Sequence, residues 1–105
     1  MSEFDERDRS IEAQFAQDED MLFRILARRN RLLGEWAARL MGLSEAEAES
    51  YSKDLVRADF EGGDGKDVTL KLLGDLTGAG VEIDEDRIRE AIKQKLVEAR
   101  RQLIG

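Results

Sequence analysis

The chain has 105 residues, of which 24 are acidic and 17 are basic, so its formal net charge is −7. This length suits one domain with a single hydrophobic core. Charged residues make up 39% of the chain, compared with about 25% in average globular domains. The negative charge argues against a general affinity for nucleic acid or anionic lipid, because such binding depends on neutralising phosphate groups.

Cysteine, histidine and proline are absent from the sequence. Without cysteine there is no disulfide framework and no thiolate nucleophile. Without histidine, a serine or threonine nucleophile has no imidazole to activate it, and zinc loses its usual ligands. The carboxylates alternate with basic residues, which is typical of solvated surfaces and not of paired catalytic acids. We therefore predict a protein that is not an enzyme and that binds no cofactor or metal.

The N-terminus carries no targeting signal of a familiar kind. It is acidic, whereas secretory signals begin with a basic region and mitochondrial transit peptides are rich in arginine. No apolar run approaches the roughly 20 residues that a membrane span needs. We expect a soluble cytoplasmic protein with no direct membrane insertion and no nucleic-acid partner.

The first predicted helix covers residues 4 to 40, because large apolar residues recur there at intervals that return to one helix face. These residues are Phe4, Ile11, Phe15, Leu22, Leu26, Leu33, Trp36 and Leu40. Residues 1 to 20 hold eight acids and two bases, a net charge of −6, whereas residues 21 to 42 hold five arginines and one glutamate, a net charge of +4. Because the start of this helix is highly charged and poor in apolar residues, we predict a disordered or nascent-helical arm at 1–18 and a bundle domain at 19–105.

The second predicted helix begins shortly after Gly42, which marks the end of the first. Ser44 and Glu47 fit a capping box, in which the serine hydroxyl and the glutamate carboxylate each accept a backbone N–H of the other residue. A glycine-rich turn at 61–65 closes this helix. Its predicted apolar face consists of Ala48, Tyr51, Leu55 and Ala58.

A short third helix is predicted over residues 66–77, with an apolar stripe of Val68, Leu72, Leu73 and Leu76, and the glycines within 78–80 end it. Asp84 is a suitable N-cap for a fourth helix. The apolar stripe of this last helix consists of Ile88, Ile92, Leu96, Ala99 and Leu103. Four amphipathic helices with short connections predict an all-α fold, a four-helix up-and-down bundle with a long first helix and a flexible N-terminal arm.

Two short strings partly match known ligand sites. Residues 60–67 contain a Gly-Lys pair but lack the flanking glycine and hydroxyl residue of a phosphate-binding loop, so we interpret them as a turn. The acids at 84–86 lack the spaced oxygen ligands of an EF-hand, and we interpret them as a helix cap. The aromatic residues occur at helical spacing, so we predict core positions for Trp36, Tyr51 and Phe60.

Two stretches of the chain resemble a known family. They are residues 27–38, with the sequence Ala-Arg-Arg-Asn-Arg-Leu-Leu-Gly-Glu-Trp-Ala-Ala, and the run Ala-Asp-Phe at 58–60. With Phe4, Arg7, Glu12, Phe15, Ala16, Asp18 and Phe23, they are similar to the zeta subunit family of alphaproteobacteria, which inhibits the F-type ATP synthase. The resemblance implies an inhibitor of ATP hydrolysis whose N-terminal helix inserts at a catalytic subunit interface and blocks rotation in the hydrolysis direction. It also implies the alpha, beta and gamma subunits of the ATPase head as partners, on the cytoplasmic side of the membrane-bound ATP synthase.

The resemblance assigns partner binding in the arm to Phe4, Arg7, Glu12, Phe15, Ala16 and Asp18. For the cluster of Arg28, Arg29, Asn30 and Arg31, two interpretations stay open: contact with a partner or a weakly bound nucleotide, or a solvated stripe that pairs with acids of the bundle. The alternative function is a helical adaptor or a nucleotide-sensing regulatory bundle with another client. Only the resemblance at 27–38 argues against this alternative.

Overall fold

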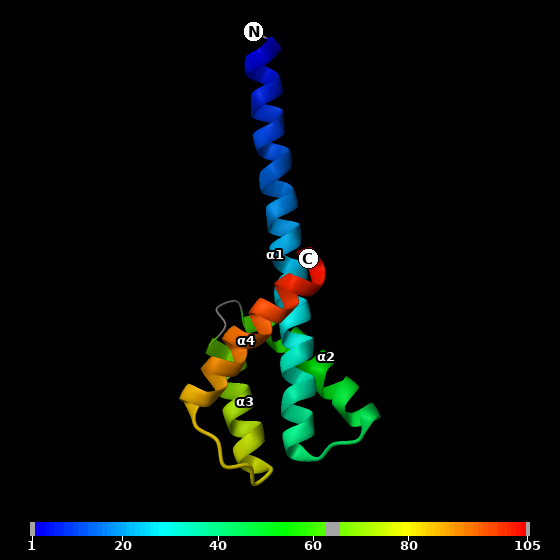
Figure 1. The fold of residues 1–105 in the computed structure, drawn as a ribbon, viewed down its shortest axis with the longest axis vertical. Helices are drawn as coiled ribbons and strands as arrows, with labels where there is room; N and C mark the ends of the chain where they lie inside the picture. The colour runs from blue at the N-terminus through cyan, green and yellow to red at the C-terminus, as the bar shows by residue number, and fades with distance from the viewer. Residues whose placement is uncertain (1, 63–65, 105) are drawn as a thin grey trace.

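The computed structural model describes the backbone of residues 2–62 and 66–104 and the side chains of residues 19–61 and 68–104. Within these ranges there are four helices and no strand: α1 (Ser2–Met41), α2 (Glu45–Gly62), α3 (Lys66–Gly78) and α4 (Glu85–Ile104). Successive helices run in opposite directions (Figure 1). The predicted all-α, up-and-down four-helix architecture is confirmed.

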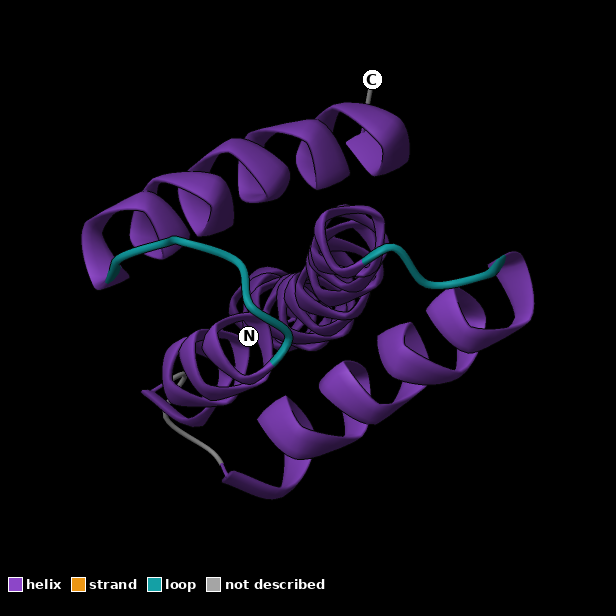
Figure 2. Ribbon diagram, turned by 90° about the horizontal axis from the view of Figure 1, so that it is seen from below, coloured by secondary structure: helices purple, strands orange, loops and turns teal. Residues whose placement is uncertain are grey.

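The long helix α1 forms the axis of the molecule. A helix of 40 residues spans about 60 Å, which accounts for most of the longest dimension in the molecular extents of 64 × 24 × 21 Å. Figure 2 looks along α1 and α3, and α2 and α4 cross them on opposite sides. Within the bundle, α1 is therefore covered by other helices on more than one side.

The N-terminal turns of α1 stand clear of the other three helices (Figure 1). The backbone of residues 2–18 is helical and spans about 25 Å along the axis. The side chains of residues 1–18 lie outside the described residues. That the isolated protein has a disordered or nascent-helical arm, divided from the bundle after residue 18, stays a prediction.

All four helices contribute to one hydrophobic core. Its fully buried members are Leu33, Ala37, Leu55, Val68, Leu72, Leu76, Ile88 and Ala91. Burial of apolar surface of this kind is the main favourable term in folding. The predicted stripes of α3 and α4 supply Val68, Leu72, Leu76 and Ile88, so the helical periodicity located the core faces of these two helices correctly.

The predicted core positions of the aromatic residues are confirmed for two of three. Trp36 and Tyr51 are partly buried and pack against the core. The core position predicted for Phe60 is wrong, because its side chain is 66% exposed. α2 crosses α1 obliquely (Figure 1), so its last turn lies beside α1 and not over the core. There the Phe60 ring meets the ring of Phe23, with centroids 4.9 Å apart in an edge-on arrangement.

The apolar stripe predicted for α1 is buried only along part of its length. Leu33 is fully buried, whereas Leu22 and Leu40 are 54% and 45% exposed. The buried residues Ile25, Ala37 and Ala38 lie outside the predicted stripe, and Met41, next to Leu40, packs against the core. Periodicity therefore predicted the helix α1 correctly but only part of its buried face.

Local side-chain hydrogen bonds start α2 and α4 where the sequence predicted. The Glu47 backbone N–H donates to Ser44 Oγ at 3.2 Å, and the Ser44 N–H donates to Glu47 Oε1 at 3.0 Å, so the capping box is confirmed. These bonds from Ser44 lower the pKa of the Glu47 carboxyl. Asp84 Oδ1 accepts the backbone N–H of Arg87 at 2.9 Å and caps α4.

Glycines in the left-handed region of backbone conformation end α1 and α3. Gly42 and Gly80 have φ angles of 73° and 83°. The residue after each glycine donates its N–H to the carbonyl five residues earlier, at 3.0 and 2.9 Å, which is the Schellman arrangement. The glycine-rich turn predicted at 61–65 includes residues 63–65, which lie outside the described residues.

Candidate functional site

The six arm residues assigned to partner binding lie on the part of α1 that projects from the bundle. They are Phe4, Arg7, Glu12, Phe15, Ala16 and Asp18, and their side chains lie outside the described residues. The helical backbone places Phe4, Ile11 and Phe15 on one face, because intervals of four and seven residues return to the same side of a helix. The roles of these residues stay predictions.

The arginine cluster divides between two sides of α1. Arg28 and Arg31 are exposed, whereas the Arg29 side chain is only 12% exposed and Asn30 is 1% exposed. Successive helical residues are about 100° apart, so a run of four cannot face one way. A partner or nucleotide could reach Arg28 and Arg31 directly, whereas Arg29 and Asn30 are turned toward α2.

Arg29 and Asn30 join Asp59 of α2 in a compact hydrogen-bond network. Asn30 Nδ2 donates to Asp59 Oδ2 at 2.7 Å, and Arg29 Nη2 lies 3.4 Å from the same oxygen. Arg29 Nε and Nη2 also donate to Asn30 Oδ1, at 3.2 and 3.1 Å. Burial lowers the pKa of Arg29, and the negative charge of Asp59 opposes that shift. The network ties α1 to the C-terminal part of α2, near the place where α1 leaves the bundle.

One turn further along α1, Gly34 lets the two helices approach closely. A Cβ atom at this position would lie 2.5 Å from Ser52 Oγ and 2.6 Å from Ser52 Cα. Ser52 is only 2% exposed, and its hydroxyl donates to the carbonyl oxygen of Arg31 at 3.3 Å. Sequence reasoning missed this contact. The spacing of Asn30, Gly34 and Ala37 on one helix face was the signal that could have found it.

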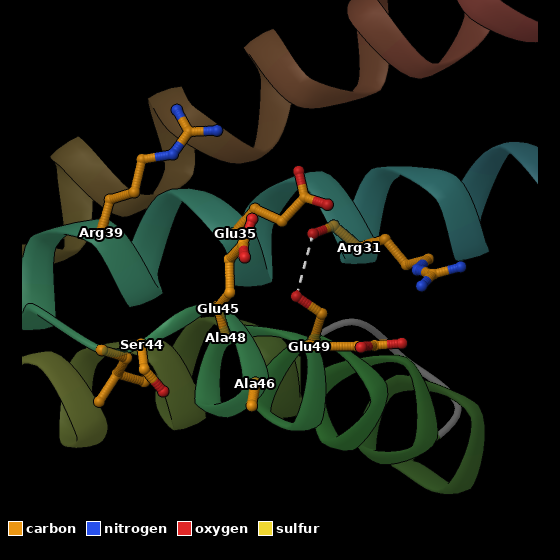
Figure 3. A pocket seen from close by; sticks show the side chains of 10 residues that line it. Arg31, Glu35, Arg39, Ser44, Glu45, Ala46, Ala48 and Glu49 are labelled. Carbon is orange, nitrogen blue, oxygen red and sulfur yellow. Dashed lines mark hydrogen bonds between the residues drawn. The ribbon is translucent and has the colours of Figure 1, made fainter.

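A pocket of about 820 Å³ lies between the second half of α1 and the start of α2 (Figure 3). Its lining residues are Arg31, Glu35, Arg39, Leu43, Ser44, Glu45, Ala46, Ala48, Glu49 and Ser52. Two arginines against three glutamates give the lining a formal charge of 2 minus 3, or −1, which disfavours phosphate groups. The first turn of α2 there is capped by Ser44. The pocket gives no support to nucleotide binding, which stays a prediction.

A second polar cluster links α2 to α3. The Tyr51 hydroxyl donates to Asp75 Oδ2 at 2.7 Å, and Lys71 Nζ donates to the same oxygen at 3.1 Å. The Lys71 ammonium also lies 5.3 Å from the centroid of the Tyr51 ring. Burial is the largest cause that raises the pKa of Tyr51 well above its usual 10.0, and the hydrogen bond to Asp75 adds to it.

We predict that Tyr51 stays protonated well above pH 10 in the folded protein. Because its pKa is raised on folding, it contributes stability that is complete below pH 10.0 and is lost as the pH rises toward the folded-state pKa. Tyr51 is the only tyrosine, so tyrosinate absorbance reports this one group. Ionisation should coincide with alkaline unfolding followed by circular dichroism. A normal titration near pH 10 in the folded state would contradict the buried hydrogen bond.

The described residues include no group of three or more His, Cys, Asp or Glu side chains that could hold a metal ion. Among the described helices, none is both long enough and apolar enough to cross a membrane. Every buried side-chain nitrogen and oxygen atom described has a hydrogen-bond partner.

Comparison with known proteins agrees with the resemblance in the sequence. No match was found among curated proteins. A protein whose structure was solved by solution NMR is 39% identical to this chain, with a TM-score of 0.70, over 80% of this chain and 95% of that protein. The profile of the family described as ATPase inhibitor subunit zeta matches residues 1–102. The chain therefore belongs to the ATPase inhibitor subunit zeta family.

Proposed function

We propose that this protein inhibits ATP hydrolysis by the F-type ATP synthase by inserting residues 1–18 as a helix at a catalytic subunit interface. In this proposal the inserted helix contacts the alpha, beta and gamma subunits of the ATPase head and blocks rotation in the hydrolysis direction. The protein acts as a regulator and not as an enzyme, on the cytoplasmic side of the membrane-bound synthase. The match of the zeta family over residues 1–102 is the observation that carries the proposal.

The form of α1 supports a role for the arm in binding. Its N-terminal turns project from the bundle as a helix that no other helix covers (Figure 1). A projecting amphipathic helix suits recognition in a groove of another protein, where its apolar face becomes buried. Phe4, Ile11 and Phe15 supply that face. We assign to Arg7, Glu12 and Asp18 charge-assisted contacts that set the register in the groove.

Energetic considerations indicate that the arm does not bind alone. Burying each large apolar side chain contributes about 1.5–3 kcal/mol, whereas ordering each backbone residue costs about 1–2 kcal/mol before helical hydrogen bonds form. Phe4, Ile11 and Phe15 do not offset the ordering of a whole arm. We infer that the bundle also contacts the ATPase head and raises the effective concentration of the arm at its groove.

The test measures ATP hydrolysis by an alphaproteobacterial F-type ATPase head with three additions. These are the intact chain, a chain that starts at residue 19, and a peptide of residues 1–18. The intact chain should inhibit, the shortened chain should not, and the peptide should inhibit only at much higher concentration because it lacks the bundle contact. Circular dichroism of the shortened chain checks that its bundle remains folded.

Point variants in the arm sharpen this test. Phe15→Ala should weaken inhibition without changing the melting temperature, whereas Gln17→Ala should have little effect. Gln17 lies about 200° from Phe15 around the helix axis and is a polar control. Unchanged inhibition by Phe15→Ala would remove Phe15 from the site. Equal inhibition by the intact and shortened chains would contradict the role of the arm.

A further inference from the structure

Three large apolar side chains are exposed together where α1 leaves the bundle. Leu22 is 54% exposed, Phe23 is 47% exposed, and Phe60 of α2 is 66% exposed. The rings of Phe23 and Phe60 lie edge to face with centroids 4.9 Å apart, so residues of two helices form one surface. We name Leu22, Phe23 and Phe60 the root patch. Exposed apolar side chains that cluster in this way mark interaction sites more often than scattered ones do.

The neighbouring side of the same turn, which faces α4, is also apolar. A shallow pocket of about 350 Å³ is lined there by Met21, Leu22, Ile25, Leu96 and Arg100. Leu22 belongs to both the root patch and this pocket, so apolar surface extends around α1 from its α2 side to its α4 side. A partner surface that surrounds α1 at this level would bury apolar groups on both flanks.

The root patch is held in place by the polar network behind it. Asp59 precedes Phe60 and accepts the hydrogen bond from Asn30 at 2.7 Å. The Asp59 and Arg29 side chains are 15% and 12% exposed, and so are largely shielded from water. This anchoring fixes the last turn of α2 against α1 before any partner binds. A surface ordered in advance loses less conformational entropy on binding.

The helix geometry brings this patch next to the inserted arm. α1 is unbroken from Ser2 to Met41, and its rise is about 1.5 Å per residue. Phe23 therefore lies about 7.5 Å along the axis from residue 18. This distance is shorter than the width of a helix with its side chains, about 10–12 Å. In the proposed complex, the mouth of a groove that encloses residues 1–18 would therefore lie next to the root patch.

We infer that the root patch is the second contact surface of this protein on the ATPase head, seated against an apolar rim at the mouth of the groove that receives the arm. The inference rests on the proposed function and names the part of the bundle that docks. Arg24 and Asp20, an exposed ion pair at 3.2 Å, lie beside the patch and supply the polar border usual around the apolar centre of an interface.

The experiment compares full-length variants as inhibitors of ATP hydrolysis by the same ATPase head. Phe60→Ala and Phe23→Ala should each raise the half-inhibitory concentration roughly tenfold or more, as aromatic residues at interface centres do. The matched control is Leu70→Ala in α3, which removes a side chain that is 62% exposed but is not part of the root patch. This control should inhibit like the unaltered chain. Melting temperatures of all variants show whether a loss of potency comes from unfolding.

The outcomes separate this inference from the proposed function. If the unaltered chain inhibits and both Phe60→Ala and Phe23→Ala inhibit as strongly as it does, the root patch is not a contact surface, although the proposed function stands. If the unaltered chain does not inhibit, the proposed function fails and the inference falls with it. Sedimentation of the unaltered chain at the assay concentration should show a monomer. A dimer that Phe60→Ala dissociates would assign the root patch to a second copy of the chain and overturn the inference.

Discussion

Replacing Gly34 with alanine is expected to lower the melting temperature by roughly 5 °C, although alanine is the better helix former. The new methyl group would lie 2.6 Å from the Ser52 Cα atom, which belongs to backbone and cannot turn aside like a flexible side chain. α1 and α2 would have to separate. Overpacking of this kind costs about 2 kcal/mol in the middle of its usual range, against a gain in helix propensity of about 1 kcal/mol, so the net cost is about 1 kcal/mol. Thermal unfolding followed by circular dichroism measures the change.

Gly74→Ala is the matched control for this substitution. Gly74 lies within α3, is exposed, and has open space within 4 Å of the place where a Cβ atom would stand. Alanine should therefore stabilise the protein by about 0.5–1 kcal/mol through helix propensity and a less flexible unfolded chain. Opposite shifts at the two glycines would assign the effect at Gly34 to the contact with α2. Stabilisation at both would show that the helices separate at little cost.

Replacing Asp59 with alanine is expected to destabilise the protein by about 2–4 kcal/mol. The substitution leaves the Arg29 guanidinium without its counter-ion and the buried Asn30 Nδ2 group without the acceptor of its hydrogen bond. Removing one member of a buried ion pair costs about 3–5 kcal/mol. The slight remaining exposure of Arg29 and Asp59 reduces that cost. Urea-induced unfolding measures the free energy of unfolding. Asp59→Asn keeps an acceptor oxygen but not the charge, so its effect should be smaller.

An exposed ion pair provides the control for Asp59. Lys53 and Glu49 lie 3.6 Å apart, and their side chains are 65% and 60% exposed. Exposed pairs contribute about 0–1 kcal/mol, so Glu49→Gln should hardly change the free energy of unfolding. A cost for Asp59→Ala no larger than that for Glu49→Gln would show that the network between α1 and α2 does not stabilise the bundle.

The sequence predicted the features of this fold that depend on near neighbours. The capping residues Ser44 and Asp84 bind backbone groups three residues away. The carbonyl groups that complete the caps at Gly42 and Gly80 are also only a few residues away. Because the partners are close along the chain, residue type and spacing were sufficient to locate the helix ends.

The features that the sequence did not reveal depend on how α2 crosses α1. Asn30 and Asp59 are 29 positions apart in the chain, and no local pattern brings them together. The exposure of Phe60 has the same origin, since its place against Phe23 follows from the crossing of the two helices. The resemblance at 27–38 identified the family correctly. Only the structure shows that two residues of this stretch, Asn30 and Gly34, lie in the contact between α1 and α2.

The close fit at Gly34 also sets the angular phase of the arm. Because α1 is continuous from Ser2 to Met41, fixing its rotation at Gly34 fixes the direction in which every residue of the arm points. One residue inserted between them would rotate the arm by about 100° relative to the bundle and shift it by about 1.5 Å. The number of residues between the arm and Gly34 therefore sets which way the arm faces. Only an insertion or deletion close to a whole helical turn preserves the orientation of the arm relative to the bundle.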